Sequence, residues 1–455
     1  MSVLESTFSG WGRFPRIEGR AKRPEKIATL QEIVRAGEST SLTARGAGRS
    51  YGDAALNKDG YLILTERLNR MLAFNKETGV LCCEAGVTLG EILDVFVPRG
   101  WFLPVIPGTK FVTVGGAVAF DIHGKNHHCD GSFANFVTSF QLLTASGDIR
   151  TCSPHEHSDV FWATLGGAGL TGIITQVSFR LRRIASSYIK RHTVKAKDLD
   201  EALALFDTAS STYPYAVAWI DCLASGRSLG RSILMFGQHA RLADLDARRQ
   251  QAPLRFEHKH RMRIPFDLPA SLLNPRTVKA FNMVYYARQR SKKKHTISPI
   301  DPFFFPLDAI KDWNRMYGKR GFVQYQCVFP VTQSREALIR MLTVLRRTGS
   351  GSFLAVFKRL GSASEGLLSF PMSGHTLSLD IPVKSGLAAF LDELSRLVVD
   401  YGGRVYLAKD AYLKPDVFRA MYPAFPKWAA IKARIDPHNV FASALSRRLR
   451  LEPSA

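Results

Sequence analysis

The sequence predicts an α+β fold divided between two domains. The chain has 455 residues, 45% of them hydrophobic, which is more than one ordinary core accommodates. Residues 1–185 are rich in glycine and short β-branched segments, whereas strand and helix patterns mix from about residue 186 to residue 403. This change of character places a boundary near residue 186 and favours an α+β second domain.

The first part is expected to hold strands, turns and short helices. Strands are predicted within residues 61–68, 79–93 and 169–181. Thr88 and Glu91 have the spacing of a capping box, which predicts a helix from Thr88 to about Val97 that ends at Pro98 and Gly100. A second helix is predicted from Ser158 to Leu165, before two glycines.

The middle part combines strands with longer amphipathic helices. Its predicted strands lie at 215–223, 321–331, 351–361 and 375–383, and its predicted helices at 199–209, 334–349 and 386–403. Two basic stretches, 255–265 and 287–298, lack periodicity and are expected to be solvated loops, with a cationic rim or lid over an anionic ligand as the alternative. From Arg404 onward, a strand and further helices are expected.

The charge balance points to an anionic partner. The net charge is +23, which suits nucleic acid, an acidic membrane surface or a phosphate-bearing substrate. The basic residues are spread over loops rather than interleaved with aromatics, which disfavours nucleic acid. The N-terminus has no continuous apolar segment, and no uncharged apolar run reaches about 18 residues. We therefore expect no signal peptide and no transmembrane helix, and a cytoplasmic or membrane-associated protein whose membrane contact is peripheral.

A loop at residues 44–57 is both flexible and cationic. Gly46, Gly48 and Gly52 alternate with Arg45 and Arg49. Glycines let the backbone approach a ligand, successive N–H groups can form an anion-binding nest, and arginine can add a charge-assisted bond to phosphate. The spacing is neither that of a P-loop nor G-x-G-x-x-G. Alone, the loop fits a generic glycine-rich turn equally well.

Two further glycine-bearing stretches follow in the same part of the chain. Residues 104–137 contain a Pro-Gly-Thr turn, a Gly-Gly pair and the segment HGKNHH, and residues 161–179 contain four glycines between a predicted helix and strand. The histidines lack acidic or cysteine partners at metal-ligand spacing, so no metal is expected. Three such loops in one domain together favour an extended dinucleotide lying along backbone.

The order of these motifs carries a family resemblance. R-G-x-G-x-S-Y-G-D, P-G-T with V-G-G-A-V-A, D-I-H-G-K-N-H-H and F-W-A-T-L-G-G-x-G-L-T-G-I-I follow one another. This order resembles the vanillyl-alcohol-oxidase superfamily of FAD enzymes and, within it, the decaprenylphosphoryl-β-D-ribose 2′-oxidases. The resemblance implies a PCMH-type FAD-binding domain at 1–187, an antiparallel-sheet substrate domain at 188–403, and a return to the FAD domain at 404–455.

The resemblance also implies site residues. The cofactor would be lined by Arg45, Gly46, Ala47, Gly48, Arg49, Ser50, Tyr51, Gly108, Thr109, Gly115, Gly116, Asp121, Ile122, His123, Gly124, Ile173, Ile174, Tyr406 and Ala408. Lys409 and His123 are the candidates that hydrogen-bond or deprotonate the substrate hydroxyl. The sugar pocket would be shaped by Tyr51, Trp219, Gln324, Gln326, Lys358 and Ser378. Trp219 could instead be core, and the two glutamines could face solvent.

The implied reaction oxidises the 2′-hydroxyl of a polyprenylphosphoryl ribose. An NAD(P)H-dependent ketoreductase would complete the epimerisation to arabinose, and a quinone or oxygen would reoxidise the flavin. Superfamily members that bind flavin covalently use a histidine where this chain has Arg49, so FAD is expected to be non-covalent. Ser378 and Thr376 stand where the mycobacterial pattern has cysteine and asparagine. The alternative is oxidation of another sugar, a sugar alcohol or an aldonolactone.

Overall fold

The N-terminal part of the chain forms two sheets. The computed structural model describes residues 2–37, 41–209, 211–257, 262–269, 272–350, 352 and 354–452. One sheet has the order β1 (Leu4–Ser9), β2 (Arg16–Lys22), β4 (Gly60–Leu64), β3 (Ser41–Arg45), with β2 and β3 parallel to β4. The other is antiparallel, in the order β5 (Met71–Phe74), β6 (Val80–Glu84), β10 (Ile173–Arg180), β8 (Val137–Leu143), β9 (Ile149–Cys152).

The middle part contributes a large sheet whose strands all pair antiparallel. Its order is β16 (Lys293–Pro299), β12 (Tyr188–Ala196), β14 (Ser232–His239), β13 (Tyr215–Ile220), β19 (Ala355–Leu360), β20 (Gly374–Pro382), β18 (Phe322–Pro330), β21 (Arg404–Val405). Short pairs join β7 (Trp101–Phe102) to β11 (Arg182–Arg183) and β15 (Met262–Arg263) to β17 (Ile310–Lys311). The α+β class and the antiparallel sheet are confirmed.

The five helices predicted with bounds are present as α2, α5, α6, α10 and α11, among other helices of the described residues. Their bounds are α1 (Ile27–Arg35), α2 (Leu89–Phe96), α3 (Val114–Ala119), α4 (His127–Asp130), α5 (Ser158–Thr164), α6 (Leu199–Ala209), α7 (Ala247–Gln251), α8 (Pro275–Arg288), α9 (Ile300–Phe304), α10 (Ser334–Arg347), α11 (Leu387–Asp400), α12 (Pro415–Met421), α13 (Phe425–Ile435) and α14 (Ala444–Leu449). The capping box is present: the Thr88 side chain accepts from the Glu91 N–H, and the Glu91 carboxylate accepts from the Thr88 N–H. A 3₁₀ turn at Val97–Arg99 follows α2, and Gly100 ends it with a φ of 80°.

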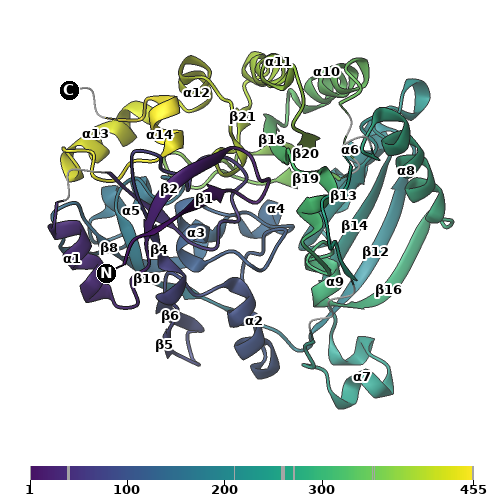
Figure 1. Cartoon of the computed structure of the whole chain (residues 1–455). Coiled ribbons are helices and arrows are strands. Elements are labelled where there is room, and N and C mark those ends of the chain that lie inside the picture. The colour runs from purple at the N-terminus through teal and green to yellow at the C-terminus, as the bar shows by residue number, and fades with distance from the viewer. Residues whose placement is uncertain are drawn as a thin grey trace.

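The end of the chain packs against its beginning. The Leu42 N–H donates to the Val440 carbonyl at 2.7 Å, and the Ala444 N–H donates to the Leu56 carbonyl at 2.8 Å. Leu42 and Phe441 share a buried cluster. Figure 1 shows the C-terminal helices α13 and α14 beside the N-terminal strands, at the opposite side of the molecule from β16.

The large sheet has one apolar and one polar face along β18 and β20. Val323, Tyr325 and Cys327 alternate with Gln324 and Gln326, and the apolar set is buried. Helices α10 and α11 cover the apolar face, because their buried leucines belong to the same core. The amide and charged side chains of these strands therefore lie on the other face of the sheet, which is directed toward the N-terminal part.

Two local expectations are wrong. Residues 287–298 do not form a loop, because they hold the end of α8 and most of β16, which pairs with β12. The strand predicted at 61–68 stops at Leu64, where Thr65–Arg67 forms a 3₁₀ turn. In the stretch 255–265, residues 258–261 lie outside the described residues.

Candidate active site

The cationic loop at 45–51 is fixed between two other segments. The Trp11 N–H donates to the Ser50 carbonyl at 2.8 Å, and the Tyr51 N–H donates to the Ala408 carbonyl at 2.9 Å. Gly48 has a φ of +61°, and a side chain on Gly46 would meet the Thr113 hydroxyl at 2.2 Å. Glycine is thus required for close packing at one position and for a left-handed backbone at the other.

The two arginines of this loop are placed to meet an anion. Arg49 lies over Trp11, with its guanidinium carbon 4.5 Å from the ring centre, and its buried Nε has no hydrogen-bond partner among the described residues. Burial lowers the pKa of Arg45 and Arg49, and the two charges repel each other at Arg45. They line a cavity of about 300 Å³ together with Ser9, Gly10, Trp11, Arg13, Ala47, Gly48, Asp312, Asn314 and Arg315. The unpartnered guanidinium nitrogen and the polar cavity fit a diphosphate group.

The second glycine stretch offers accessible backbone. Gly108 is exposed, and a side chain there would meet nothing within 4 Å. Gly115 and Gly116 lie in the first turn of α3, whose N-cap Thr113 accepts from the Gly116 N–H at 3.3 Å. Thr109 and both α3 glycines are half-buried, as residues that line a ligand cleft would be.

Some predicted cofactor residues use their side chains within the protein. The buried Asp121 carboxylate accepts from Ser132 Oγ at 2.9 Å, from Ser364 Oγ at 2.6 Å and from the Ala134 N–H at 2.9 Å. Ile173 is fully buried in the cluster that contains Leu42 and Phe441, whereas Ile174 belongs to the main core. Because neighbours on a strand point to opposite faces, the side chains of the two isoleucines point away from each other.

The remaining predicted residues of this group lie together near the large sheet. Ile122 and His123 are buried, and a side chain on Gly124 would meet Asn126 at 2.7 Å. Tyr406 and Ala408 share a buried cluster, and the Tyr406 hydroxyl donates to the Phe120 carbonyl at 2.9 Å. The His123 and Tyr406 ring centres are 5.2 Å apart.

His123 is held as a neutral imidazole. Gln326 Nε2 lies 2.9 Å from His123 Nε2 and donates to Thr376 Oγ1 at 3.1 Å, while the Thr376 hydroxyl donates to the Cys327 carbonyl. An amide nitrogen only donates, so His123 Nε2 accepts and its proton sits on Nδ1. Burial, with the charges of Lys358 and Lys409, lowers the pKa of His123 well below its ordinary value. Nδ1 has no partner among the described residues and can donate to a ligand.

Lys409 lies over the ring of Tyr51. Its Nζ is 4.7 Å from the ring centre, a cation–π contact that orients the amine. Burial lowers the pKa of Lys409, while the negative charge of Asp380 opposes the shift. Asp380 accepts from Gln324 Nε2 at 2.5 Å and from the Tyr317 hydroxyl at 3.2 Å. Lys409 is therefore closer to its uncharged, basic form than a solvated lysine.

The site is rich in lysine charge. Burial, together with the charges of Lys125 and Lys409, lowers the pKa of Lys358 to about 7. Burial also lowers the pKa of Lys125 to about 8, against the opposing charge of Asp308, and its Nζ donates to the Phe304 carbonyl at 3.0 Å. The charges of Lys125 and Lys409 disfavour the protonation of Lys358, so a bound anion beside these lysines would stabilise its ammonium form.

Strand pairing places the other predicted pocket residues. Ser378 pairs with Gln326 across β20 and β18, and Lys358 pairs with Thr376 across β19 and β20, so all share the polar face. Gln326 is buried and Gln324 half-buried, so neither faces open solvent. Trp219 pairs with Val356 on β19, two residues from Lys358, and its ring lies 4.8 Å from that of Tyr285 on α8. Trp219 is thus in register with Val356 and, through it, with Ser378 on β20.

Sequence reasoning left out three residues of this site. Asp380 accepts from Gln324 and from the Tyr317 hydroxyl, and Lys125 adds to the lysine cluster. A signal for Asp380 existed, because Thr376, Ser378 and Asp380 alternate along a predicted strand and must share a face. Tyr317 comes from a 3₁₀ turn at Trp313–Tyr317, whose position no local pattern indicates.

The histidines of the HGKNHH segment have structural partners. His127 Nδ1 accepts from the Gly361 N–H at 3.0 Å, and His128 Nε2 lies 3.0 Å from the Tyr213 carbonyl. In the part of the chain that the structure describes, no three His, Cys, Asp or Glu side chains are grouped so as to hold a metal ion.

Comparisons with known proteins agree with this site. Residues 20–153 match the family model of an FAD binding domain, and residues 317–449 match that of D-arabinono-1,4-lactone oxidase. The chain is 38% identical over 447 residues to the decaprenylphosphoryl-β-D-ribose oxidase of Mycolicibacterium smegmatis, covering 97% of each chain. It is 23% identical to the L-gulonolactone oxidase of Scyliorhinus torazame over 92% of each chain. It is also 23% identical to the L-gulono-1,4-lactone dehydrogenase of Mycobacterium tuberculosis, over 94% of this chain and 95% of that one.

The fold, the arginine-bearing loop and the matched domain define an FAD-dependent oxidoreductase. The identity across nearly the whole of both chains is more specific than the two family models. The chain belongs to the decaprenylphosphoryl-β-D-ribose oxidase family.

Proposed function

We propose that this enzyme oxidises the 2′-hydroxyl of a polyprenylphosphoryl-β-D-ribose to the 2′-ketone. The observation that carries the proposal is the presence of Lys358 and Lys409 near His123, with Lys125 close to Lys358, since such a cluster suits a phosphate ester better than a neutral sugar. The 38% identity to a relative named for this substrate supports the choice.

The reaction removes a hydride from C2′ and a proton from the 2′-oxygen. FAD, when bound, accepts the hydride. Lys409, with its pKa lowered by burial, takes the hydroxyl proton, and Tyr51 orients its amine. His123 donates through Nδ1 to a sugar oxygen, while Gln326 fixes its tautomer. Lys358 and Lys125 supply the positive charge that the phosphate requires.

We also propose how the chain is divided around this chemistry. Residues 1–187 and 404–455 would bind FAD, and residues 188–403 would bind the substrate. The contacts of Leu42 with Val440 and of Leu56 with Ala444 support the return of the C-terminus to the first part. Binding of FAD would be non-covalent at the cationic loop, because Arg49 offers no nucleophilic nitrogen for attachment there.

The product fixes the kind of partners that the enzyme needs. A 2′-keto sugar requires an NAD(P)H-dependent ketoreductase to give the arabinose epimer, as the supply of an arabinan in a cell wall would demand. A quinone or oxygen would remove the electrons. A lipid-linked substrate implies peripheral contact with a membrane by a cytoplasmic or membrane-associated enzyme. Within the described residues, no helix has the length and apolar character to cross a bilayer.

The test is an anaerobic titration of the holoenzyme. Polyprenylphosphoryl ribose should bleach the visible flavin absorption, and the arabinose epimer at the same concentration should bleach it far more slowly. L-Gulono-1,4-lactone is the matched control, because two more distant relatives carry names of enzymes for that lactone. Bleaching by the lactone but not by the lipid would replace the proposal with aldonolactone oxidation. The titration should also be repeated with other sugars on the same lipid phosphate, because Ser378 and Thr376 replace the cysteine and asparagine of the mycobacterial pattern.

A further inference from the structure

Helix α8 presents apolar side chains on its outward, exposed face. Met283 and Val284 are each 57% exposed, and Ala280 and Ala287 continue the same outward face at helical spacing. Its inward side holds the buried Val278 and Asn282. A helix with apolar residues on both sides is expected to have a partner on its outer side as well.

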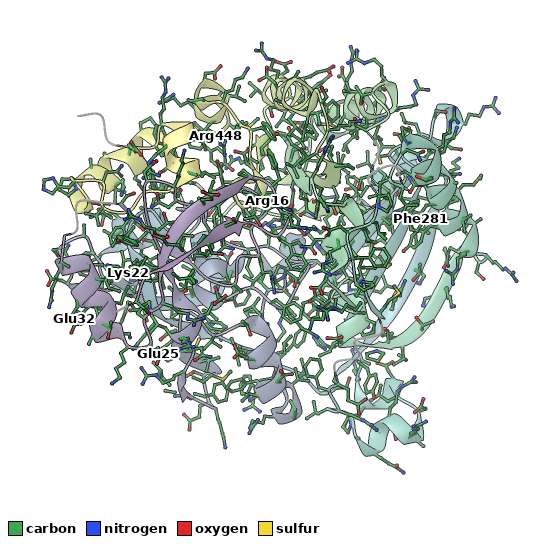
Figure 2. All side chains as sticks on the ribbon, viewed as in Figure 1. Arg16, Lys22, Glu25, Glu32, Phe281 and Arg448 are labelled. Carbon is green, nitrogen blue, oxygen red and sulfur yellow. The ribbon has the colours of Figure 1, made fainter. Side chains whose placement is uncertain are left out.

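The helix is firmly attached, so this exposure is not that of a loosely placed segment. Asn282 Nδ2 donates to the Asp221 carboxylate at 2.8 Å, and Asp221 also pairs with Arg231 at 2.7 Å. The Tyr286 hydroxyl donates to the Ala196 carbonyl at 3.1 Å. The outward face is therefore presented in one orientation, on the side of the molecule where Figures 1 and 2 show α8 and the side chain of Phe281.

Positive charge surrounds this apolar face. Residues 268–300 contain no Asp or Glu, and their basic residues are Arg276, Lys279, Arg288, Arg290, Lys292, Lys293 and Lys294. Lys293 and Lys294 begin β16, the outer strand of the large sheet, and both are exposed. Within the described residues, Lys292 makes an ion pair with Glu201 at 3.2 Å, and no ion pair forms at Lys293 or Lys294. An apolar face with a basic border matches the interface of an anionic bilayer.

We propose that the outer face of α8 and the lysines of β16 form a docking surface for an anionic lipid bilayer. This inference rests on the proposed function, because an enzyme needs a membrane-docking surface if its polyprenyl substrate resides in a membrane. Tyr285 links the surface to the substrate pocket, since its ring lies 4.8 Å from Trp219. A bilayer on α8 would thus hold the lipid beside the pocket, and the helix would lie in the interface plane.

A second copy of the chain fits this surface less well. A two-fold contact would bring the same basic border of both copies together, in a protein whose net charge is already +23. An anionic bilayer neutralises that border while it covers the apolar face.

Vesicle co-sedimentation of the holoenzyme tests the surface. We expect flavin absorption in the pellet with phosphatidylcholine vesicles that contain phosphatidylglycerol, and little with phosphatidylcholine alone. Met283→Ser with Val284→Ser should reduce pelleting about tenfold through lost apolar insertion. Lys293→Glu with Lys294→Glu should reduce it by at least the same factor through repulsion from the anionic lipid.

Matched pairs elsewhere on the surface serve as controls. Leu72→Ser with Val331→Ser removes apolar groups that are 43% and 40% exposed, and Lys76→Glu with Lys427→Glu makes the same change of charge. Both should pellet like the wild type. Equal loss in the controls, or no pelleting of the wild type, would overturn the docking surface. Sedimentation velocity that shows a dimer lost only in the α8 variant would also overturn it, in favour of a second copy.

A separate measurement keeps this inference apart from the proposed function. All variants should reduce their flavin normally with a water-soluble, short-chain polyprenylphosphoryl ribose, because none of the changed residues lies in the site. Normal reduction without vesicle binding refutes only the docking surface. Vesicle binding without reduction by any polyprenylphosphoryl ribose refutes the proposed function and leaves the surface established.

Discussion

Replacement of Lys409 by methionine is the sharpest perturbation of the proposed chemistry. The change keeps most of the side-chain volume and removes the amine that lies over Tyr51. A general base contributes about 10²–10⁴ to a rate, or about 3–5 kcal/mol of barrier at about 1.4 kcal/mol per tenfold. The rate of anaerobic flavin reduction by substrate, measured by stopped flow, should fall within that range while the flavin spectrum stays unchanged.

Folding stability should not fall with it. Burial lowers the pKa of Lys409 below its ordinary 10.5, so the folded state disfavours the ammonium relative to the unfolded chain. The contribution of Lys409 to stability is therefore unfavourable at low pH and is relieved as the pH rises from the lowered pKa of about 8 towards the ordinary 10.5. A neutral methionine carries no such penalty but also removes the positive charge that offsets the burial of Asp380, so the two effects oppose each other and the thermal midpoint of Lys409→Met should stay close to that of the wild type. A large loss of stability would mean that the rate effect is structural.

The pH profile then decides how Lys409 acts. As a base it must be neutral, so the wild-type rate should rise with pH and level off above its pKa. Asp380 opposes the lowering of that pKa, so Asp380→Asn should move the rising limb to lower pH. Lys409→Arg, which stays charged, should be as slow as Lys409→Met. A rate that falls as the pH rises, or a fast arginine variant, would refute Lys409 as the base and make it a charged donor.

Three further outcomes follow from the contacts around the loop and the sheet. Arg49→Glu should release FAD on gel filtration, since Arg49 lines the cavity beside Arg45 and has an unpartnered Nε, and full flavin occupancy would remove the diphosphate assignment. Arg448→Met should lower the free energy of unfolding by about 3–5 kcal/mol in urea titrations, because it leaves the buried carboxylates of Asp53 and Asp410 without their partner. Ser378→Cys should create a thiol whose alkylation is slowed by substrate, and a labelling rate indifferent to substrate would place position 378 outside the pocket.

Local signals in the sequence predicted the elements that position the site. The capping box of Thr88 and Glu91 and the alternation along residues 321–331 depend only on neighbours in the chain, and both are found as expected. Helix α8 was missed for a physical reason, since Met283 and Val284 put apolar groups on its solvent side and erase the amphipathic period. The exposed Met283 and Val284 therefore explain why the helix was not predicted, and they also form the apolar part of the proposed docking surface.

The family resemblance predicted which segments lie near the cofactor loop. It did not predict in which direction the side chains of those segments point. Asp121 lies in a matching motif, yet its carboxylate is used by Ser132, Ser364 and the Ala134 N–H. Ile173 and Ile174 could not be separated by the motif, although the two-residue period of a strand already forbids a common direction. Side-chain direction depends on tertiary partners that come from distant parts of the chain.

The loop for the diphosphate and the proposed base are joined through the protein itself. Tyr51 donates from its N–H to the Ala408 carbonyl, one residue before Lys409, and its ring carries the lysine amine. Arg448, labelled in Figure 2, binds Asp53 at 2.8 Å and Asp410 at 2.9 Å. It therefore clamps together the segment just after Tyr51 and the segment just after Lys409. The distance between loop and base is therefore set by a backbone hydrogen bond and a buried double ion pair. Any change that loosens this clamp should reduce FAD retention and substrate oxidation together, whereas changes on the β18–β20 face, such as at Gln326, should affect oxidation alone.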